Sequence, residues 1–419
     1  MQVISILKNK KIEAKQVFML SVLAVNGGNY FYNLILGRLL GPAQFADAAV
    51  LITLLLVLSF VAMTFQLVTA KFSVELEAAV FSCFIASIYK NAVWVGVALG
   101  ALTVVFSKQL QQVFHTTSSS MFVVFGLGVP LYFIMSVNRG VFQGKQNFKA
   151  LSITYQGEML SRLLVTLGLI FLFNLQSSVT IAIGIFVSFI IGLFPLKTEH
   201  ISFIKTFVNS THSKQIKHFF ILTAFYELTQ IIINNSDILL VKHYFESYEA
   251  GLYASLALIG RIVYFVAWMF VMLLLPTVVQ LKKEGKETAP ILFKYVSYIA
   301  IIAFGIVSVT ALFPETAITL LFGKSYISVA PLLWKYALAT GLFAVSNIFA
   351  YYYLSLAQYI PVIISGLFGL LQMCLVIWFH ESLEQVVHMQ ILAMALLLSI
   401  QLGWFVLDYK VLSRKRLNL

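Results

Sequence analysis

The sequence predicts an all-helical membrane protein with about twelve transmembrane helices. Of its 419 residues, 60% are hydrophobic and only 11% are charged, and a water-soluble domain could not bury that much apolar surface. Apolar stretches of the ~20 residues that cross a bilayer recur along the whole chain. Nearly all Lys and Arg residues fall in alternate gaps between these stretches, as the positive-inside rule requires.

The expected spans are 16–37, 45–70, 92–112, 119–139, 151–173, 178–196, 218–241, 250–280, 291–313, 328–355, 359–380 and 386–409. Each should be a helix, because backbone groups in lipid must bond within their own segment, and outer-membrane strands would alternate in polarity. Two long apolar runs are interpreted as hairpins, with turns at Asn174–Ser178 and Gln358–Pro361.

The longer gap between Lys71 and Lys90 contains apolar residues at helical spacing. This pattern predicts an amphipathic helix on the cytoplasmic leaflet. Its apolar residues are Phe72, Leu76, Val80, Phe84, Ile85 and Ile88.

The distribution of basic residues predicts the topology. One side of the membrane has 21 Lys and Arg residues in its gaps and the other has Arg38, Lys108, Lys242 and Lys324. Both termini are therefore expected in the cytoplasm of a bacterial inner membrane. The first span is expected to stay as an anchor, since no small-residue cleavage site follows it. The net charge of +12 then reflects topology and attraction to anionic lipids, not a nucleic-acid partner.

The two halves of the chain show a weak internal repeat. Sliding residues 17–38 onto 221–242 aligns Asn33 with Asp237 and Arg38 with Lys242. Six helices separate the copies, so both have the same orientation and a pseudo-two-fold axis should run along the membrane normal. We expect a six-helix lobe over 1–200, a cytoplasmic linker over 201–217 and a second six-helix lobe over 218–419. Such a duplication is typical of alternating-access transporters.

Two segments resemble bacterial polysaccharide exporters of the multidrug/oligosaccharidyl-lipid/polysaccharide exporter superfamily: Asn33–Asp47, and Asp237–Phe245 followed by Glu249–Arg261. The resemblance implies a V-shaped pair of lobes in which helices 1, 2, 7 and 8 line a central cavity. It also implies the flipping of undecaprenyl-pyrophosphate-linked oligosaccharide for O-antigen or exopolysaccharide synthesis. The partners would be this substrate, membrane lipids, an H⁺ or Na⁺ gradient and glycan-assembly proteins.

Polar side chains within those four helices are the candidate substrate-binding residues. Arg261 stands out because an intramembrane Arg costs about 2.5 kcal/mol or more and must face water, a ligand or an ion partner. Its planar guanidinium suits a pyrophosphate, and pairing with Glu227 on the neighbouring helix is the structural alternative. For the Asn and Gln residues, hydrogen bonds between helices are the alternative to contacts with sugar. The full set is Asn26, Asn29, Gln66, Glu227, Gln230, Asn234 and Arg261.

Other charged residues within or near the spans are interpreted as gating or structural ion pairs. Glu158 and Arg162 are spaced i,i+4 on one helix and should pair. Asp237 could close the outer mouth by pairing with Arg38 or Lys242. Lys335 is expected to extend outward from the start of its helix.

No motif predicts an enzyme. The sequence has no HExxH-like arrangement, no phosphate-binding glycine loop and no nucleophile elbow, and Cys83 and Cys374 are far apart. We therefore predict no catalytic residue, no metal and no cofactor. Three functions stay open: a lipid-linked oligosaccharide flippase, a cation-coupled exporter of small molecules or drugs, and a multispan surface-glycan enzyme.

Overall fold

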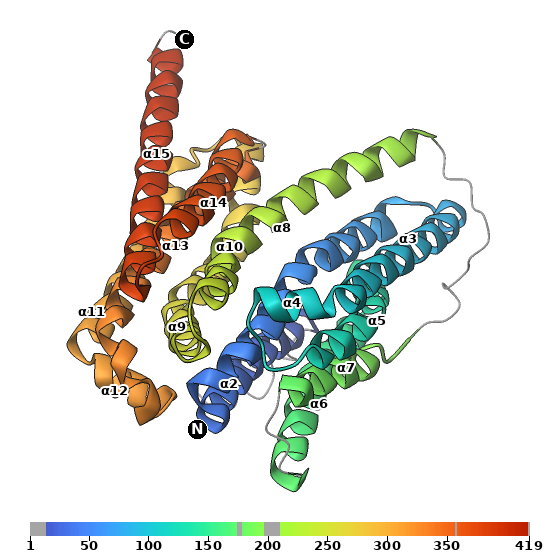
Figure 1. The fold of residues 1–419 in the computed structure, drawn as a ribbon. Coiled ribbons are helices and arrows are strands. Elements are labelled where there is room, and N and C mark those ends of the chain that lie inside the picture. The colour runs from blue at the N-terminus through green and yellow to red at the C-terminus, as the bar shows by residue number, and fades with distance from the viewer. Residues whose placement is uncertain (1–13, 174–177, 197–209, 357, 418–419) are drawn as a thin grey trace, which may run out of the picture. The chain divides into compact units, whose positions relative to one another are not determined.

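The computed structural model describes residues 14–173, 178–196, 210–356 and 358–417, and these residues are helical almost throughout (Figure 1). The predicted all-helical membrane class is confirmed. The elements are α2 (Ala14–Glu75), α3 (Ala78–Val105), α4 (Ser107–Val113), α5 (Ser120–Gly144), α6 (Phe148–Phe173), α7 (Ser178–Gly192), α8 (Ser210–Tyr244), α9 (Ser247–Gly260), α10 (Ile262–Lys283), α11 (Ala289–Leu312), α12 (Pro314–Leu321), the 3₁₀ helix η2 (Lys324–Leu332), α13 (Leu333–Ser355), α14 (Ile360–Trp378) and α15 (Leu383–Leu417).

Helix α2 contains the first two predicted spans. Its 62 residues would extend about 90 Å at 1.5 Å per residue, three times the thickness of the hydrocarbon core. The helix is interrupted at Gly41, whose φ of 70° and ψ of 172° only glycine adopts easily, and Pro42 follows. We call residues 34–57, which surround this bend, the elbow.

The remaining helices correspond to the predicted spans, although three spans, 92–112, 250–280 and 328–355, are each divided between two elements. Nine described segments are long and apolar enough to cross a membrane, and α7 is a shorter apolar helix. With α2 counted as two crossings and α9 with α10 as one, the described helices account for the twelve predicted crossings. The hairpin break near Gln358 is confirmed between α13 and α14. Residues 174–177 of the first predicted turn and residues 201–209 of the predicted linker lie outside the described residues.

The amphipathic helix on the leaflet is a wrong prediction. Residues 78–90 form the first half of α3, and Phe84 and Ile85 are each 1% exposed. The ring of Phe84 packs 5.8 Å from that of Phe72, which also lies 6.2 Å from Phe219. An apolar stripe can be buried against neighbouring helices as well as against lipid, and periodicity does not distinguish the two.

Contacts divide the chain into two compact units. The first unit contains residues 1–33 and 58–227, and the second contains residues 34–57 and 228–419. The elbow of α2 therefore belongs to the second unit, although it comes early in the sequence. In the first unit α3 packs on α5, and α6 packs on α7. The predicted lobe boundaries at 200 and 218 stay a prediction.

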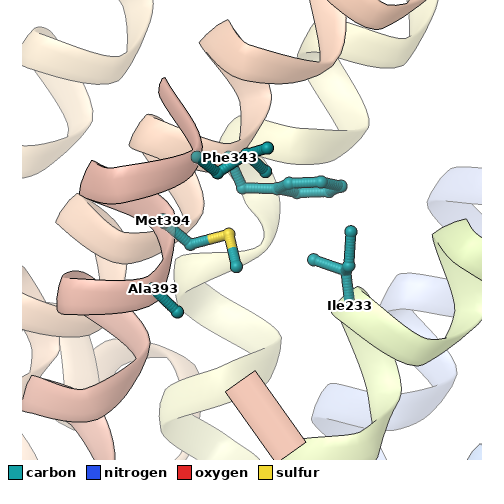
Figure 2. Packing of buried hydrophobic residues seen from close by; sticks show 5 residues of the cluster. Ile233, Phe343, Ala393 and Met394 are labelled. Carbon is teal, nitrogen blue, oxygen red and sulfur yellow. The ribbon is translucent and has the colours of Figure 1, made fainter. Parts of the chain in front are cut away.

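Helix α13 is the central helix of the second unit. It packs against α9, α10, α11, α14 and α15. One buried cluster joins Ile233 of α8, Phe343 of α13 and Ala393, Met394 and Leu397 of α15, and Figure 2 shows the side chains of Phe343 and Met394 facing Ile233. This cluster forms one wall of the candidate site.

Candidate functional site

Arg261 forms a buried ion pair with Asp237 in the second unit. Arg261 lies at the junction of α9 and α10 and is only 8% exposed. Its Nη2 donates to Asp237 Oδ1 at 2.7 Å, and its Nη1 donates to Asn235 Oδ1 at 3.4 Å. Arg261 thus has an ion partner, as the structural alternative expected, but this partner is Asp237 and not Glu227.

The direction of the side chain explains this difference. Helices α8 and α9 are joined by a short turn after Tyr244, so Asp237 lies nearer that turn than Glu227 does. A helical side chain leans toward the N-terminus of its own helix, and α9 begins at this turn. Arg261 therefore extends back toward Asp237.

Asp237 accepts hydrogen bonds from two tyrosines as well. Its Oδ2 accepts from Tyr336 Oη at 2.7 Å and from Tyr253 Oη at 3.1 Å, and the residue is 2% exposed. Gln390 Nε2 donates to the hydroxyl of Tyr253 at 2.5 Å. A guanidinium and two phenols offset the cost of burying this carboxylate.

Asp237 does not pair with Arg38 or Lys242 in this structure. Lys242 Nζ lies 3.1 Å from Asp47 Oδ1, and Arg38 donates to main-chain carbonyls at the end of α12. Asp237 and Lys242 are five residues apart on one helix, so they point to different faces, since only i,i+3 and i,i+4 pairs are neighbours.

A small cavity lies beside the Arg261–Asp237 pair. Its volume of about 20 Å³ accommodates one water molecule, far less than a sugar or a pyrophosphate. One wall is apolar, with Ile233, Phe343 and Met394 (Figure 2). Its polar lining consists of Asn234, Asp237, Arg261, Tyr336, Thr340, Gln372 and Gln390. In this conformation Arg261 faces its ion partner and the cavity.

The other candidates on α8 form contacts within their own unit or lie half-buried. Gln230 Nε2 donates to Asn347 Oδ1 at 3.2 Å, and its Oε1 accepts from Tyr264 at 3.3 Å. Asn234 Nδ2 donates to the carbonyl of Gln230 at 2.8 Å. Glu227 is half-buried. Gln230 is thus engaged in the bonds between helices that were the alternative to sugar contact.

The first unit contains a second buried charge cluster. Glu158 pairs with Arg162, as their i,i+4 spacing predicts, and its Oε2 also lies 2.8 Å from Arg139 Nη2. Arg139 further donates from Nε to Thr154 Oγ1 at 3.0 Å and stacks on the ring of Tyr155 at 4.0 Å. Two cations and one carboxylate leave this cluster with one positive charge in excess.

Sequence reasoning missed Arg139 because it counted this residue among the charges of a cytoplasmic gap. The span was ended at 139, whereas α5 continues to Gly144 and buries the guanidinium. A hydropathy profile places the ends of spans at charged residues. A charged residue that is buried beside its ion partners is therefore mistaken for the end of a span. In the sequence Glu158 already has a partner in Arg162, so no unmatched acid pointed to Arg139.

The candidate binding residues on α2 differ in their hydrogen bonds and in their exposure. Gln66 is buried and donates to Gln143 Oε1 at 2.8 Å and to Tyr155 Oη at 2.9 Å, so it is linked to the Arg139 cluster. Asn29 Oδ1 is buried without a hydrogen-bond partner among the described residues, and Asn26 is exposed. Lys335, expected to extend outward, lies 2.5 Å from Glu384 in an exposed pair.

Comparison with known proteins identifies the family. Residues 35–331 match the family model described as "Polysaccharide biosynthesis protein". The chain belongs to this family. The match covers most of the chain, including residues 35–47 of the first segment that carries the sequence resemblance and the whole of the second. No curated protein sequence matches the chain.

Solved structures show that this member of the family has the fold of the multidrug/oligosaccharidyl-lipid/polysaccharide exporter superfamily. The lipid II flippase MurJ in an inward closed conformation aligns with a TM-score of 0.74 and 13% identity, over 94% of this chain and 87% of that one. A superfamily transporter from Pyrococcus furiosus aligns with a TM-score of 0.64 and 12% identity, over 95% of each chain. An outward-facing multidrug transporter of the MATE family aligns with a TM-score of 0.61 and 12% identity, over 96% of this chain and 97% of that one.

These comparisons confirm the predicted superfamily and its polysaccharide branch. The chain is a multi-pass membrane protein of a polysaccharide-biosynthesis family with the fold of flippases and multidrug transporters, and this fold favours the two transport functions over the surface-glycan enzyme. At 12–13% identity the solved structures show the fold alone. The substrate must be inferred separately.

Proposed function

We propose that the protein flips a polyprenyl-pyrophosphate-linked oligosaccharide from the cytoplasmic to the outer leaflet, for the synthesis of a surface polysaccharide such as O-antigen or exopolysaccharide. The observation that carries the proposal is a polysaccharide-biosynthesis family match over 35–331 on a fold that a lipid II flippase shares. The sugar head would cross by alternating access while the lipid tail stays in the bilayer.

The buried charges favour an anionic cargo. The pairs Asp237–Arg261 and Asp47–Lys242 are neutral, whereas the Arg139–Glu158–Arg162 cluster has a cation in excess. A buried positive charge attracts a pyrophosphate and repels a cationic drug.

The proposed role of Arg261 requires a change in its contacts. In this conformation Asp237 and a one-water cavity leave no room for a phosphate at the guanidinium. We infer that the substrate reaches Arg261 in another state of the cycle, in which the pyrophosphate replaces Asp237 as its partner. A bidentate phosphate contact would compensate the broken pair.

The amide side chains are proposed as contacts for sugar hydroxyls. Asn29, with its unpartnered oxygen, and the exposed Asn26 are the most available. Gln66 and Gln230 would first have to leave their present partners. Asn234 at the cavity and the half-buried Glu227 complete the proposed set.

The cellular setting is part of the same proposal. The protein would reside in the bacterial inner membrane with both termini in the cytoplasm, since the basic gaps lie on that side. An H⁺ or Na⁺ gradient would drive turnover, and glycan-assembly proteins would deliver and receive the substrate. The six-helix lobes 1–200 and 218–419 would move against each other about the 201–217 linker.

A second candidate function is cation-coupled export of small molecules. Its support is the fold shared with a multidrug transporter and the half-buried acid Glu227, which lies outside the three ion-pair clusters above. An acidic group in a transport path would bind a proton, a metal ion or a cationic drug.

Reconstitution separates the two functions. Vesicles would contain the purified protein and a lipid-linked oligosaccharide, and a membrane-impermeant glycosidase would report which head groups face outward. We expect the wild type to move the head groups, Arg261→Ala to lose this activity and Arg261→Lys to keep part of it. Lys335→Ala, which removes a half-buried Lys that pairs with Glu384 outside the proposed binding residues, is the control and should flip normally. Head groups that stay on their original side with the wild type, together with export of a cationic dye, would establish the second function instead.

A further inference from the structure

The carboxylate of Asp237 binds Arg261 and the two tyrosines through different oxygens. Its Oδ1 accepts from Arg261 Nη2 at 2.7 Å, whereas its Oδ2 accepts from Tyr336 Oη at 2.7 Å and from Tyr253 Oη at 3.1 Å. The guanidinium can therefore leave Oδ1 while both phenol hydrogen bonds to Oδ2 stay in place. The function proposed above requires Arg261 to leave, and it assigns no partner to the carboxylate that is left behind.

A carboxylate left alone at this position would oppose the release of Arg261. Asp237 is only 2% exposed, so bulk water does not hydrate it in this state. Removing one partner of a buried ion pair is strongly destabilising, because the remaining charge is neither hydrated nor paired. Hydrogen bonds to an ionised acceptor are roughly twice as strong as bonds between neutral groups. Two such bonds that survive the release would lower its free-energy cost.

Packing fixes the two tyrosines at the carboxylate. Tyr253 of α9 and Tyr336 of α13 are 0% and 2% exposed, and their ring centroids lie 5.7 Å apart in an edge-to-face arrangement. The ring of Tyr336 also lies against Gly260, where a Cβ would overlap it. Both hydroxyls are thus positioned by contacts between α9 and α13 that do not involve the guanidinium.

Gln390 of α15 orients the hydroxyl of Tyr253. Its Nε2 donates to Tyr253 Oη at 2.5 Å. A phenol oxygen that accepts from an amide still has its own hydrogen to donate, and Asp237 Oδ2 is the acceptor. The chain of hydrogen bonds from Gln390 through Tyr253 to Asp237 therefore has one direction of donation, toward the carboxylate.

The small cavity beside the ion pair serves the other carboxylate oxygen. Its lining includes Asp237, Arg261, Tyr336, Gln372 and Gln390. Its volume of about 20 Å³ accommodates one water molecule. When the guanidinium withdraws, a water molecule held there would donate to Oδ1. The carboxylate would then have a donor at each oxygen without a second cation.

We propose that Tyr253 and Tyr336 are positioning residues that hold the Asp237 carboxylate while Arg261 binds the diphosphate of the cargo. This proposal rests on the function proposed above, because it takes as given that a diphosphate reaches Arg261. Asp237 and the diphosphate compete for one guanidinium, and the phenols favour the diphosphate by stabilising Asp237 in its released state. Their effect on the cargo is indirect and acts through Asp237.

The chemistry of a phenol suits this role. Its hydroxyl donates to an anion without a formal charge, so it stabilises the carboxylate and competes only weakly for the diphosphate. A Lys or Arg in place of either tyrosine would neutralise Asp237 more strongly, but it would also offer the cargo a second cation. With two neutral donors, the released guanidinium is the group that attracts the diphosphate.

Binding of a diphosphate tests the competition. The probe is farnesyl pyrophosphate, and its dissociation constant is measured by calorimetry with the purified protein in detergent. We expect Tyr336→Phe to weaken binding about tenfold and Asp237→Asn to tighten it. In the Asp237→Asn background Tyr336→Phe should have no effect, because no carboxylate is left to hold. A purely structural role of the phenol would weaken binding equally in both backgrounds, and that result would overturn the proposal.

Tyr353→Phe is the matched control. Tyr353 lies on the same helix as Tyr336, is 0% exposed and also donates to an acid, Asp408, at 3.4 Å. It is about 25 Å further along α13 at 1.5 Å per residue, so the loss of its hydroxyl should leave diphosphate binding unchanged. Equal weakening by Tyr336→Phe and Tyr353→Phe would show a general loss of stability and would also overturn the proposal.

A second measurement needs no diphosphate and so separates the role of the tyrosines from the proposed substrate. Arg261→Met mimics the released state, in which Asp237 has lost the guanidinium. Tyr336→Phe should lower the melting temperature in detergent at least about twice as far in the Arg261→Met background as in the wild type, because the phenols are then the main donors to the carboxylate. Equal shifts in the two backgrounds would refute the role of Tyr336. Unequal shifts, together with a wild type that binds no diphosphate, would refute only the proposed substrate.

Discussion

Replacing Asp237 by Asn should destabilise the protein by about 3–5 kcal/mol, the usual cost of removing one partner of a buried ion pair. The change leaves the guanidinium of Arg261 buried without a counter-charge. An Asn oxygen can still accept one of the two tyrosine hydrogen bonds, at 2.7 Å and 3.1 Å in the native protein. The loss of charge is therefore the main term, and the lost phenol contact adds to it.

A double-mutant cycle measures this coupling directly. The free energy of unfolding is measured in mixed micelles for Asp237→Asn, for Arg261→Met and for the double variant. Since the double variant buries no unpaired charge, its loss should be smaller than the sum of the two single losses by about 1–3 kcal/mol. Additive losses would show that the two residues do not interact, and would refute our account of the site.

Two further predictions concern α6 and α2. Glu158→Gln removes the common partner of Arg139 and Arg162 and should cost about 3–5 kcal/mol of unfolding free energy. Glu384→Gln removes an exposed carboxylate and should have a far smaller effect. Equal effects on thermal stability in detergent would contradict the burial argument. Gly41→Ala should cost about 1–3 kcal/mol because of its positive φ, while Gly27→Ala, at an open position on the same helix, should be neutral or slightly stabilising in the same assay.

The fold was predictable because the bilayer imposes it. Helical spans of ~20 residues follow from the lack of hydrogen-bonding water in lipid, and the break between α13 and α14 was visible at Gln358–Pro361. Helix α3 was not predicted correctly, because Phe84 and Ile85 form an apolar stripe that suits either lipid or a neighbouring helix. Only the tertiary contact with Phe72 decides between them.

The sequence predicted which polar and charged residues of the site lie within spans, where their burial costs free energy, but it did not predict which of them contact each other. Arg261 stood out because its charge lies within a span, and the structure gives that charge a buried partner. The identity of that partner depends on where α9 begins and on the direction in which its side chains lean. Neither can be read from the depth of a residue within its predicted span. Arg139 was missed for the opposite reason, since its own charge was used to mark the end of its span.

The buried ion pairs also differ in how a movement of the two units would affect them. The Arg139–Glu158–Arg162 cluster joins α5 to α6 within the first unit, and Asp237–Arg261 joins α8 to the end of α9 within the second, so a movement of whole units leaves both intact. Asp47–Lys242 also lies within the second unit, but α2 continues on both sides of Asp47 into the first unit, so a movement of whole units would have to bend α2 around this pair. Separating a buried ion pair costs little free energy only where both charges become hydrated as they part. Asp47 and Lys242 both lie at ends of predicted spans, 45–70 and 218–241, so charges that part there would meet water soonest.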